Sequence, residues 1–122
     1  MKTILKLSIL GLLSLSSFTY GQDVTKGNAR DRVIDELYCY NTNSCFVVFN
    51  EFLDKKAGCA GNGGLSRRAL TVDISTDSGK SIYSTALAAF MVAKKISIYG
   101  DGTCAGRGNY AVENVFYIQM KR

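Results

Sequence analysis

Five runs of apolar and β-branched residues surround one helical segment, and their order along the chain is strand, strand, strand, helix, strand, strand. That order is typical of the OB-fold, a five-stranded Greek-key barrel whose single helix lies between strands three and four. A leader at residues 1–21 and four cysteines are the other two informative features. The sequence therefore predicts a mainly β, disulfide-stapled OB-fold-like barrel formed by one domain, residues 22–122.

The first two strands are predicted at residues 32–40 and 46–53, where aromatic and β-branched side chains flank a polar turn at residues 41–44. A polar turn between two such runs indicates a hairpin. Residues 55–64 are rich in lysine and glycine and show no apolar period, so we expect a long loop there.

Residues 68–75 alternate between apolar and polar side chains and form the predicted third strand. The helix is expected at residues 80–94, with Asp77 or Ser78 as its N-cap. The fourth strand begins at Ile96.

The fifth strand is predicted at about residues 112–120. Successive side chains of a strand point to opposite faces, so the alternation assigns one set to the barrel interior and the other to the surface. The expected inward set is Val112, Phe116, Ile118 and Met120, and the expected outward set is Glu113, Tyr117 and Gln119.

The leader is predicted to be a secretory signal peptide. Two lysines precede a leucine-rich run at residues 7–15 that is too short to span a bilayer, and Thr19 and Gly21 are small residues suited to a cleavage site. An N-terminal membrane anchor is the alternative. No later apolar run is long enough for a membrane span, so we expect a protein exported to a periplasm or to the extracellular space.

The cysteines form an even set, which in an exported chain favours two disulfides. Of the three possible connectivities we favour Cys39–Cys45, directly opposite each other in the first hairpin, with Cys59–Cys104. A zinc site is the competing interpretation. It is not favoured, because the chain has no histidine and no C-x-x-C pair.

The absence of histidine also restricts the chemistry. It excludes imidazole-activated serine or cysteine nucleophiles and imidazole metal sites. Pairs of carboxylates could in principle hydrolyse glycosides, but nothing in the sequence places two of them across a cleft. We therefore expect no enzymatic activity, no cofactor and no metal. The acidic pairs are Asp35 with Glu36, Asp73 with Asp77, and Asp101 with Glu113.

The predicted helix carries no charged residue between Ser81 and Ala93. One face, which includes Ile82 and Phe90, suits the end of a barrel, but the opposite side is also without charge. A surface helix normally has a polar stripe, so this one is expected to be covered on both sides by oligomerisation. The alternative is that small residues and one methionine are tolerated on the surface. The candidate oligomer interface is Ala88, Met91 and Val92.

The segment Asp31-Arg32-Val33-Ile34-Asp35-Glu36-Leu37 resembles the first strand of the B subunits of subtilase cytotoxin and typhoid toxin, which reads D-x-V-I-x-E-L. Residues 95–104 also resemble a group of small exported bacterial proteins without an assigned function. The toxin resemblance implies an OB-fold pentamer that binds sialylated glycans, lines a central pore with its helices and delivers a catalytic A subunit.

A glycan site carried over from that resemblance centres on Arg30, which stands where the toxin subunits have a serine that contacts the sialic acid carboxylate. An arginine can pair with a carboxylate bidentately, although an exposed arginine can equally be a solvated cation. Exposed tyrosine rings supply faces on which sugars stack. The candidate glycan-binding residues are Arg30, Asp31, Tyr38, Tyr99 and Tyr117.

The net charge and the loops bear on two other classes of partner, nucleic acid and protein. The formal charge is +5, and removing the leader with its two lysines lowers it to about +3, a weak excess that makes nucleic acid an unlikely partner. A stand-alone exported module that binds a protein is the main alternative to the glycan-binding ring. Such a module would use the loops at residues 55–64 and 100–109.

Overall fold

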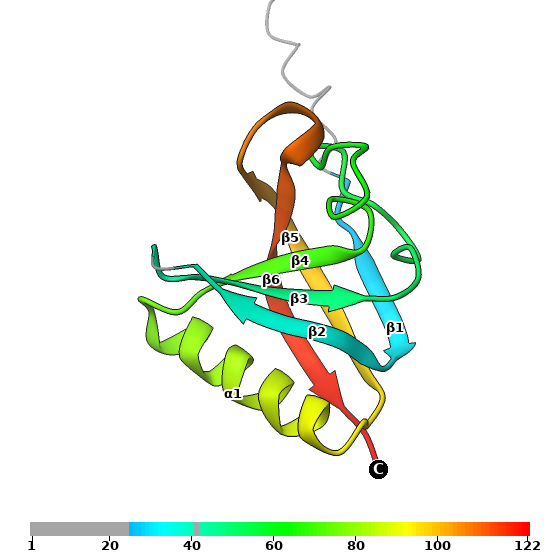
Figure 1. The fold of residues 1–122 in the computed structure, drawn as a ribbon, viewed down its shortest axis with the longest axis vertical. Coiled ribbons are helices and arrows are strands. Elements are labelled where there is room, and N and C mark those ends of the chain that lie inside the picture. The colour runs from blue at the N-terminus through cyan, green and yellow to red at the C-terminus, as the bar shows by residue number, and fades with distance from the viewer. Residues whose placement is uncertain (1–24, 41) are drawn as a thin grey trace, which may run out of the picture.

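The computed structural model describes residues 25–40 and 42–122; the predicted signal peptide, residues 1–21, lies outside the described residues. Within them the chain forms one six-stranded sheet, one α-helix and a short 3-10 helix (Figure 1). The elements are β1 (Asn28–Arg32), β2 (Ile34–Cys39), β3 (Ser44–Phe49), β4 (Ala69–Asp73), α1 (Asp77–Met91), β5 (Ile96–Ala105), η2 (Gly108–Tyr110) and β6 (Val112–Met120).

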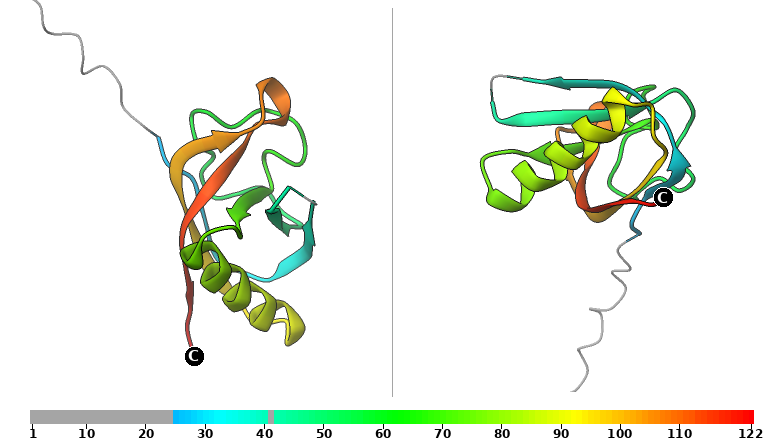
Figure 2. Two further views of the ribbon diagram at one scale, coloured as in Figure 1. Left: turned by 90° about the vertical axis from the view of Figure 1, so that its left-hand side faces the viewer. Right: turned by 90° about the horizontal axis from the view of Figure 1, so that it is seen from below.

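The strands are ordered β1-β5-β6-β4-β3-β2 in the sheet. All neighbours run antiparallel except β4 and β6, which run parallel. The two end strands of the sheet, β1 and β2, are consecutive in the chain and are separated only by Val33. The sheet therefore curls until its two ends meet at that residue (Figures 1 and 2).

The expected count of five strands is wrong, because the sequence pattern misses β1: the predicted first strand, residues 32–40, corresponds to β2. Residues before Val33 pair with β5, whereas residues after it pair with β3. Asp31 has a positive φ of 54°, and the pairing register shifts between Ala29 and Arg32, so the ladder does not continue through this point. An alternating sequence does not reveal that a strand changes partners along its length.

The main core lies between the curled sheet and α1, which lies across one end of the sheet (Figure 2). It is built around the fully buried Val47, Phe49, Leu70 and Ile98. A second cluster covers the other face of β3 and β4, where Phe46, Val48, Ala69 and Val112 pack with Leu65 of the connecting segment. Much of β3 and β4 is thus buried on both faces, so the alternation seen in the sequence does not mark one exposed face.

The helix is shifted toward the N-terminus relative to the prediction. Its N-cap is Thr76, whose Oγ1 accepts a hydrogen bond from the Gly79 backbone N–H at 2.9 Å, so neither Asp77 nor Ser78 is the cap. A Cβ at Gly79 would overlap the carbonyl oxygen of Asp73, which explains the glycine in the first turn. The helix ends before residue 94 because Ala93 adopts a positive φ of 52°.

The predicted orientation of the last strand is partly wrong, although its bounds are as expected. Glu113 is fully buried, whereas Phe116 is 61% exposed and Met120 is 39% exposed. The ladder between β5 and β6 shifts register between Gly100 and Cys104, which interrupts a strict alternation. The predicted alternation of inward and outward side chains along this strand holds only where the pairing register is unbroken.

Both predicted disulfides are confirmed. Cys39 and Cys45 are bonded and lie directly opposite each other in the β2–β3 hairpin. Cys59 and Cys104 are bonded and tie the segment after β3 to β5. In the described part of the chain, no helix is long and apolar enough to cross a bilayer.

Candidate functional site

Four of the five candidate glycan-binding residues gather on the outer surface of β1, β5 and β6. Ile98 packs into the core, and its neighbour Tyr99 therefore points outward. Tyr99 lies opposite Tyr117 in the β5–β6 ladder and opposite Asn28 in the β1–β5 ladder. Arg30 and Asp31 follow on β1.

The two tyrosine rings form a stacked pair. Their centroids lie 4.5 Å apart and their planes differ by 15°. Tyr117 is 45% exposed, and Phe116 meets it edge-on with centroids 5.6 Å apart. Aromatic rings that remain half exposed present an apolar face to solvent, to which a ligand with a flat apolar face can bind.

An open hollow of about 410 Å³ lies beside this pair. Its charged groups comprise two cations and two carboxylates. Two of its lining residues are joined by a hydrogen bond of 3.0 Å from the Asp31 backbone N–H to Ser97 Oγ. We call this hollow together with Tyr117 the tyrosine face. The lining residues are Arg30, Asp31, Asp54, Ser97, Tyr99 and Lys121.

Two arginines two residues apart have different roles here. The Arg32 guanidinium donates to Asp54 Oδ1 at 2.5 Å and to the Phe52 carbonyl at 2.9 Å, which ties the end of β1 to the segment after β3. The backbone N–H of Arg30 donates to the other oxygen of Asp54 at 2.6 Å. Among the described residues the Arg30 guanidinium has no ion pair, so it can bind an anionic group.

Lys121 and Asp54 are members of this face that the sequence interpretation missed. The alternation that places Tyr117 and Gln119 outward extends by one step to Lys121, so the sequence held a signal for this lysine. Asp54 lies in a segment without a regular period, and only the folded chain brings it to β1.

Tyr38, the fifth candidate, belongs to a separate group on the β2–β3 hairpin. Its ring stacks on Phe46 with centroids 5.2 Å apart, and the ring of Tyr40 meets both rings edge-on. Burial raises the pKa of Tyr38, and the nearby Tyr40 and Glu36 raise it further. The single site expected from the sequence is therefore divided between two surfaces.

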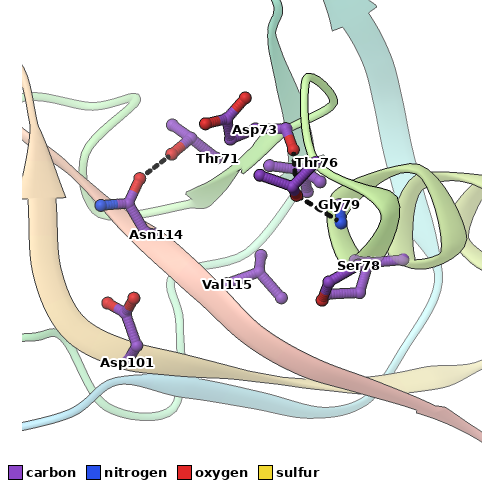
Figure 3. A pocket seen from close by; sticks show the side chains of 10 residues that line it. Thr71, Asp73, Thr76, Ser78, Gly79, Asp101, Asn114 and Val115 are labelled. Carbon is purple, nitrogen blue, oxygen red and sulfur yellow. Dashed lines mark hydrogen bonds between the residues drawn. The ribbon is translucent and has the colours of Figure 1, made fainter.

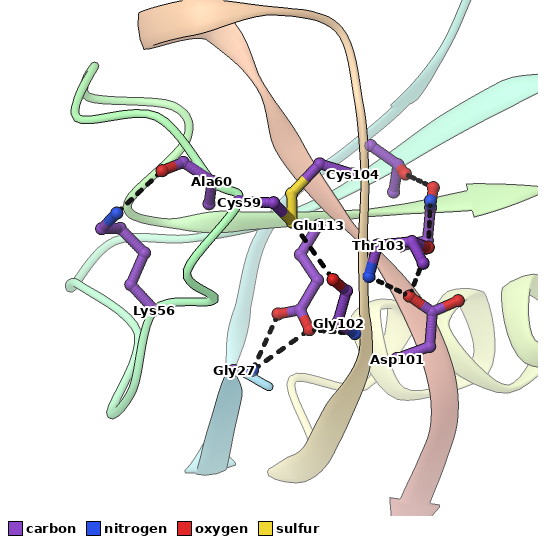
Figure 4. Close-up of a disulfide and its surroundings, with 11 residues drawn as sticks. Gly27, Lys56, Cys59, Ala60, Asp101, Gly102, Thr103, Cys104 and Glu113 are labelled. Carbon is purple, nitrogen blue, oxygen red and sulfur yellow. Dashed lines mark hydrogen bonds between the residues drawn. A yellow bond between two sulfur atoms is a disulfide. The ribbon is translucent and has the colours of Figure 1, made fainter. Parts of the chain in front are cut away.

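Glu113 is a buried carboxylate that the sequence placed on the surface. It accepts hydrogen bonds from the Gly27 backbone N–H at 3.0 and 3.1 Å and from the Gly102 backbone N–H at 2.8 Å (Figure 4). A Cβ at Gly100 would overlap this carboxylate. Burial raises the pKa of Glu113, while the bonds from Gly27 and Gly102 lower it; nearby Asp101 adds to the rise. We call Glu113 with these three glycines the Glu113 cluster.

The candidate oligomer interface on α1 is exposed. Met91 is 73% exposed and Val92 is 70% exposed, and Ala88 is exposed as well. Leu87, which the sequence interpretation did not include, is 42% exposed on the same helix. Exposed apolar side chains clustered on one helix are typical of a surface that binds another protein.

Comparisons with protein-family models, with curated proteins and with solved structures gave no match for this chain. The function must therefore be inferred from the geometry and chemistry of the chain's own residues.

Proposed function

We propose that this protein is an exported, non-catalytic OB-fold barrel that binds glycans at the tyrosine face and assembles into a ring through α1. One observation carries the proposal: Arg30, Tyr99 and Lys121, which are far apart in the sequence, line one open hollow, and Tyr117 stacks on Tyr99 beside it. The resemblance of residues 31–37 to toxin B subunits supports the same interpretation.

The strand topology supports the OB-fold assignment. When β1 and β2 are taken as one bent strand, the elements follow the order strand, strand, strand, helix, strand, strand. The two ends of the sheet then belong to a single strand, as closure of a five-stranded barrel requires.

The chemistry of the tyrosine face suits an acidic glycan. The exposed ring of Tyr117 offers a stacking surface for the apolar face of a pyranose. Arg30 and Lys121 can bind a carboxylate, and the oxygens of Asp31 can accept hydrogen bonds from sugar hydroxyls. A hollow that combines rings with both signs of charge discriminates between ligands, whereas a uniformly basic groove would bind any polyanion.

The test is titration of the oxidised mature protein with 3′-sialyllactose by calorimetry. We expect saturable binding that Arg30→Ala weakens about tenfold or more, because it removes a charge-assisted hydrogen bond. Arg107→Ala is the matched control, since Arg107 is exposed and lies near η2. Equal affinity of Arg30→Ala and the native protein would place the site elsewhere. Absence of binding to both sialylated and neutral oligosaccharides would refute the glycan-binding function.

Ring assembly has its own test, the solution mass of the same protein by light scattering. We expect a pentamer that Met91→Asp dissociates, because a charge would be buried in an apolar interface. Met120→Asp is the matched control at an exposed methionine outside the helix. A monomeric native protein would exclude the ring and favour the stand-alone protein-binding module.

A further inference from the structure

A row of polar side chains crosses the sheet from β4 over β6 to β5, apart from the tyrosine face. Thr71 Oγ1 donates to Asn114 Oδ1 at 2.7 Å, and Asn114 Nδ2 donates to Thr103 Oγ1 at 2.9 Å. Thr103 Oγ1 in turn donates to Asp101 Oδ1 at 2.6 Å. We call these four residues the polar row. Each member orients the next, so the row is a preorganised set of donors and acceptors.

Three members of the polar row, Thr71, Asn114 and Asp101, line a cavity of about 280 Å³ between the sheet and the start of α1 (Figure 3). Asp101 and Asn114 lie on the sheet side, and Ser78 lies on the helix side. The strands β4 and β6, which contribute to the lining, pair at only two positions, Leu70 with Glu113 and Thr71 with Asn114. Its volume is near the lower end of the range for ligand pockets.

Two carboxylates at this cavity are held in the same way. Oδ1 of Asp73 accepts hydrogen bonds from the backbone N–H and the hydroxyl of Ser75. Oδ1 of Asp101 likewise accepts hydrogen bonds from the backbone N–H and the hydroxyl of Thr103. Among the described residues, Oδ2 of each carboxylate has no hydrogen-bond partner. The hydrogen bonds from Ser75 lower the pKa of Asp73, so this carboxylate is an ionised acceptor at neutral pH.

The aromatic group of the β2–β3 hairpin adjoins the polar row by strand register. Phe46 lies directly opposite Thr71 in the β3–β4 ladder, so both side chains are on one face of the sheet. Tyr38 lies opposite Phe46 in the β2–β3 ladder and stacks on it. Of these rings, Tyr40 is 55% exposed and Tyr38 is half-buried, whereas Phe46 is buried. Partly exposed tyrosine rings beside a wall of carboxylate, amide and hydroxyl groups combine a stacking surface with acceptors and donors for vicinal hydroxyls.

We propose that the polar row and this aromatic group form a second subsite, which takes a neutral pyranose residue. No lysine or arginine lines the cavity, and its two carboxylates would repel an anionic sugar. The free oxygen of Asp101 and the second N–H of Asn114 supply an acceptor and a donor on two residues that line the same cavity, which suits a pair of adjacent sugar hydroxyls. The inference rests on the proposed glycan-binding function and adds to it a second sugar class on a second surface.

The test is an NMR titration of the oxidised, isotope-labelled mature protein with the methyl glycosides of galactose, glucose, mannose and N-acetylglucosamine, in buffer containing EDTA. We expect at least one of them to give saturable shifts at Asn114, Asp101 and Tyr38, with millimolar affinity. Asp101→Asn should weaken this binding about tenfold, the effect of losing one charged acceptor. Asp77→Asn is the matched control, an acidic residue in the first turn of α1 that does not line the cavity.

Several outcomes would overturn the proposal. One is the absence of saturable shifts with all four glycosides; another is binding whose shifts map to Tyr99 and Tyr117. Equal weakening by Asp101→Asn and Asp77→Asn would show a general charge effect. Sialyllactose binding at the tyrosine face together with no neutral-sugar binding would refute the second subsite alone, whereas failure of both would refute the glycan-binding function itself.

Discussion

The same two strands, β5 and β6, carry two polar regions of opposite character. In the Glu113 cluster the carboxylate is fully buried, and its partners are backbone N–H groups of Gly27 and Gly102. In the tyrosine face, Tyr117 is half exposed, and Arg30 has no ion pair among the described residues. Satisfied polar groups stabilise a fold, whereas exposed groups with unused bonding capacity are available to a ligand. Substitutions in the two regions should therefore separate stability from binding.

Among single substitutions, the largest loss of stability is expected for Gly100→Ala. The new methyl group would overlap the buried Glu113 carboxylate, and neither the carboxylate nor the β5 backbone can move without breaking hydrogen bonds. We expect the free energy of unfolding in urea to fall by about 3 kcal/mol or more. Gly64→Ala is the matched control, because a Cβ there meets nothing within 4 Å. Equal stability of the two variants would show that the Glu113 cluster is loosely packed.

Removing the disulfides one at a time ranks their contributions. The Cys59–Cys104 bond closes a separation of 45 residues beside the Glu113 cluster, and the Cys39–Cys45 bond closes a separation of 6. Loop-closure entropy predicts that the free energy of unfolding falls by about 4 kcal/mol without the Cys59–Cys104 bond and by about 2 kcal/mol without the Cys39–Cys45 bond. Urea unfolding of the two double-serine variants measures both. A larger loss from the short loop would contradict the entropic ranking.

The stability of the Glu113 cluster should depend on pH. Because the pKa of Glu113 is raised in the folded state, the folded chain binds a proton more tightly than the unfolded chain does. The contribution of Glu113 to stability is therefore fully present below its unfolded pKa, about 4.3, and is lost as the pH rises through the folded pKa. Glu113→Gln does not titrate, so the stability advantage of the native protein over this variant should shrink as the pH rises.

Urea titrations of both proteins at a series of pH values between about 4 and about 8 test this dependence. Asp77→Asn serves as the control for removal of one exposed carboxylate. A native advantage that grows with pH would mean that the hydrogen bonds from Gly27 and Gly102 outweigh burial and that the pKa of Glu113 is lowered.

The elements were predictable where local pattern decides them. The bounds of β6 follow from its alternation, and the disulfide pairing follows from cysteine spacing and the hairpin. The separate strand β1, before Val33, and the burial of Glu113 were not predictable in this way. Both depend on which strand pairs with which, and on a register shift between Gly100 and Cys104 that arises only when distant segments meet.

Several residues of the tyrosine face were predictable from the sequence, but the surface that they form together was not. Alternation alone places Tyr99 and Tyr117 outward, and the resemblance of the first strand indicates Arg30. Their assembly depends on the β5–β6 register, and Tyr38 lies on another surface because β2 is separated from β6 and β5 by β3 and β4 in the sheet. The polar row could not be predicted, because its Thr71–Asn114 hydrogen bond joins β4 and β6, which pair in the sheet although α1 and β5 lie between them in the sequence.

The smallest loss of stability and the most specific loss of binding are expected for Tyr117→Ala. The residue is 45% exposed, so removal of its ring costs the folded chain little beyond the contacts with Tyr99 and Phe116, about 1 kcal/mol. The stacking surface for the sugar disappears with it, and the affinity for 3′-sialyllactose should fall about tenfold or more by calorimetry. Tyr110→Ala is the matched control, a tyrosine that is 84% exposed on η2. If Tyr117→Ala destabilised the protein as strongly as Gly100→Ala while binding persisted, the exposed ring would be part of the structural scaffold, and the contrast between the two regions of β5 and β6 would be lost.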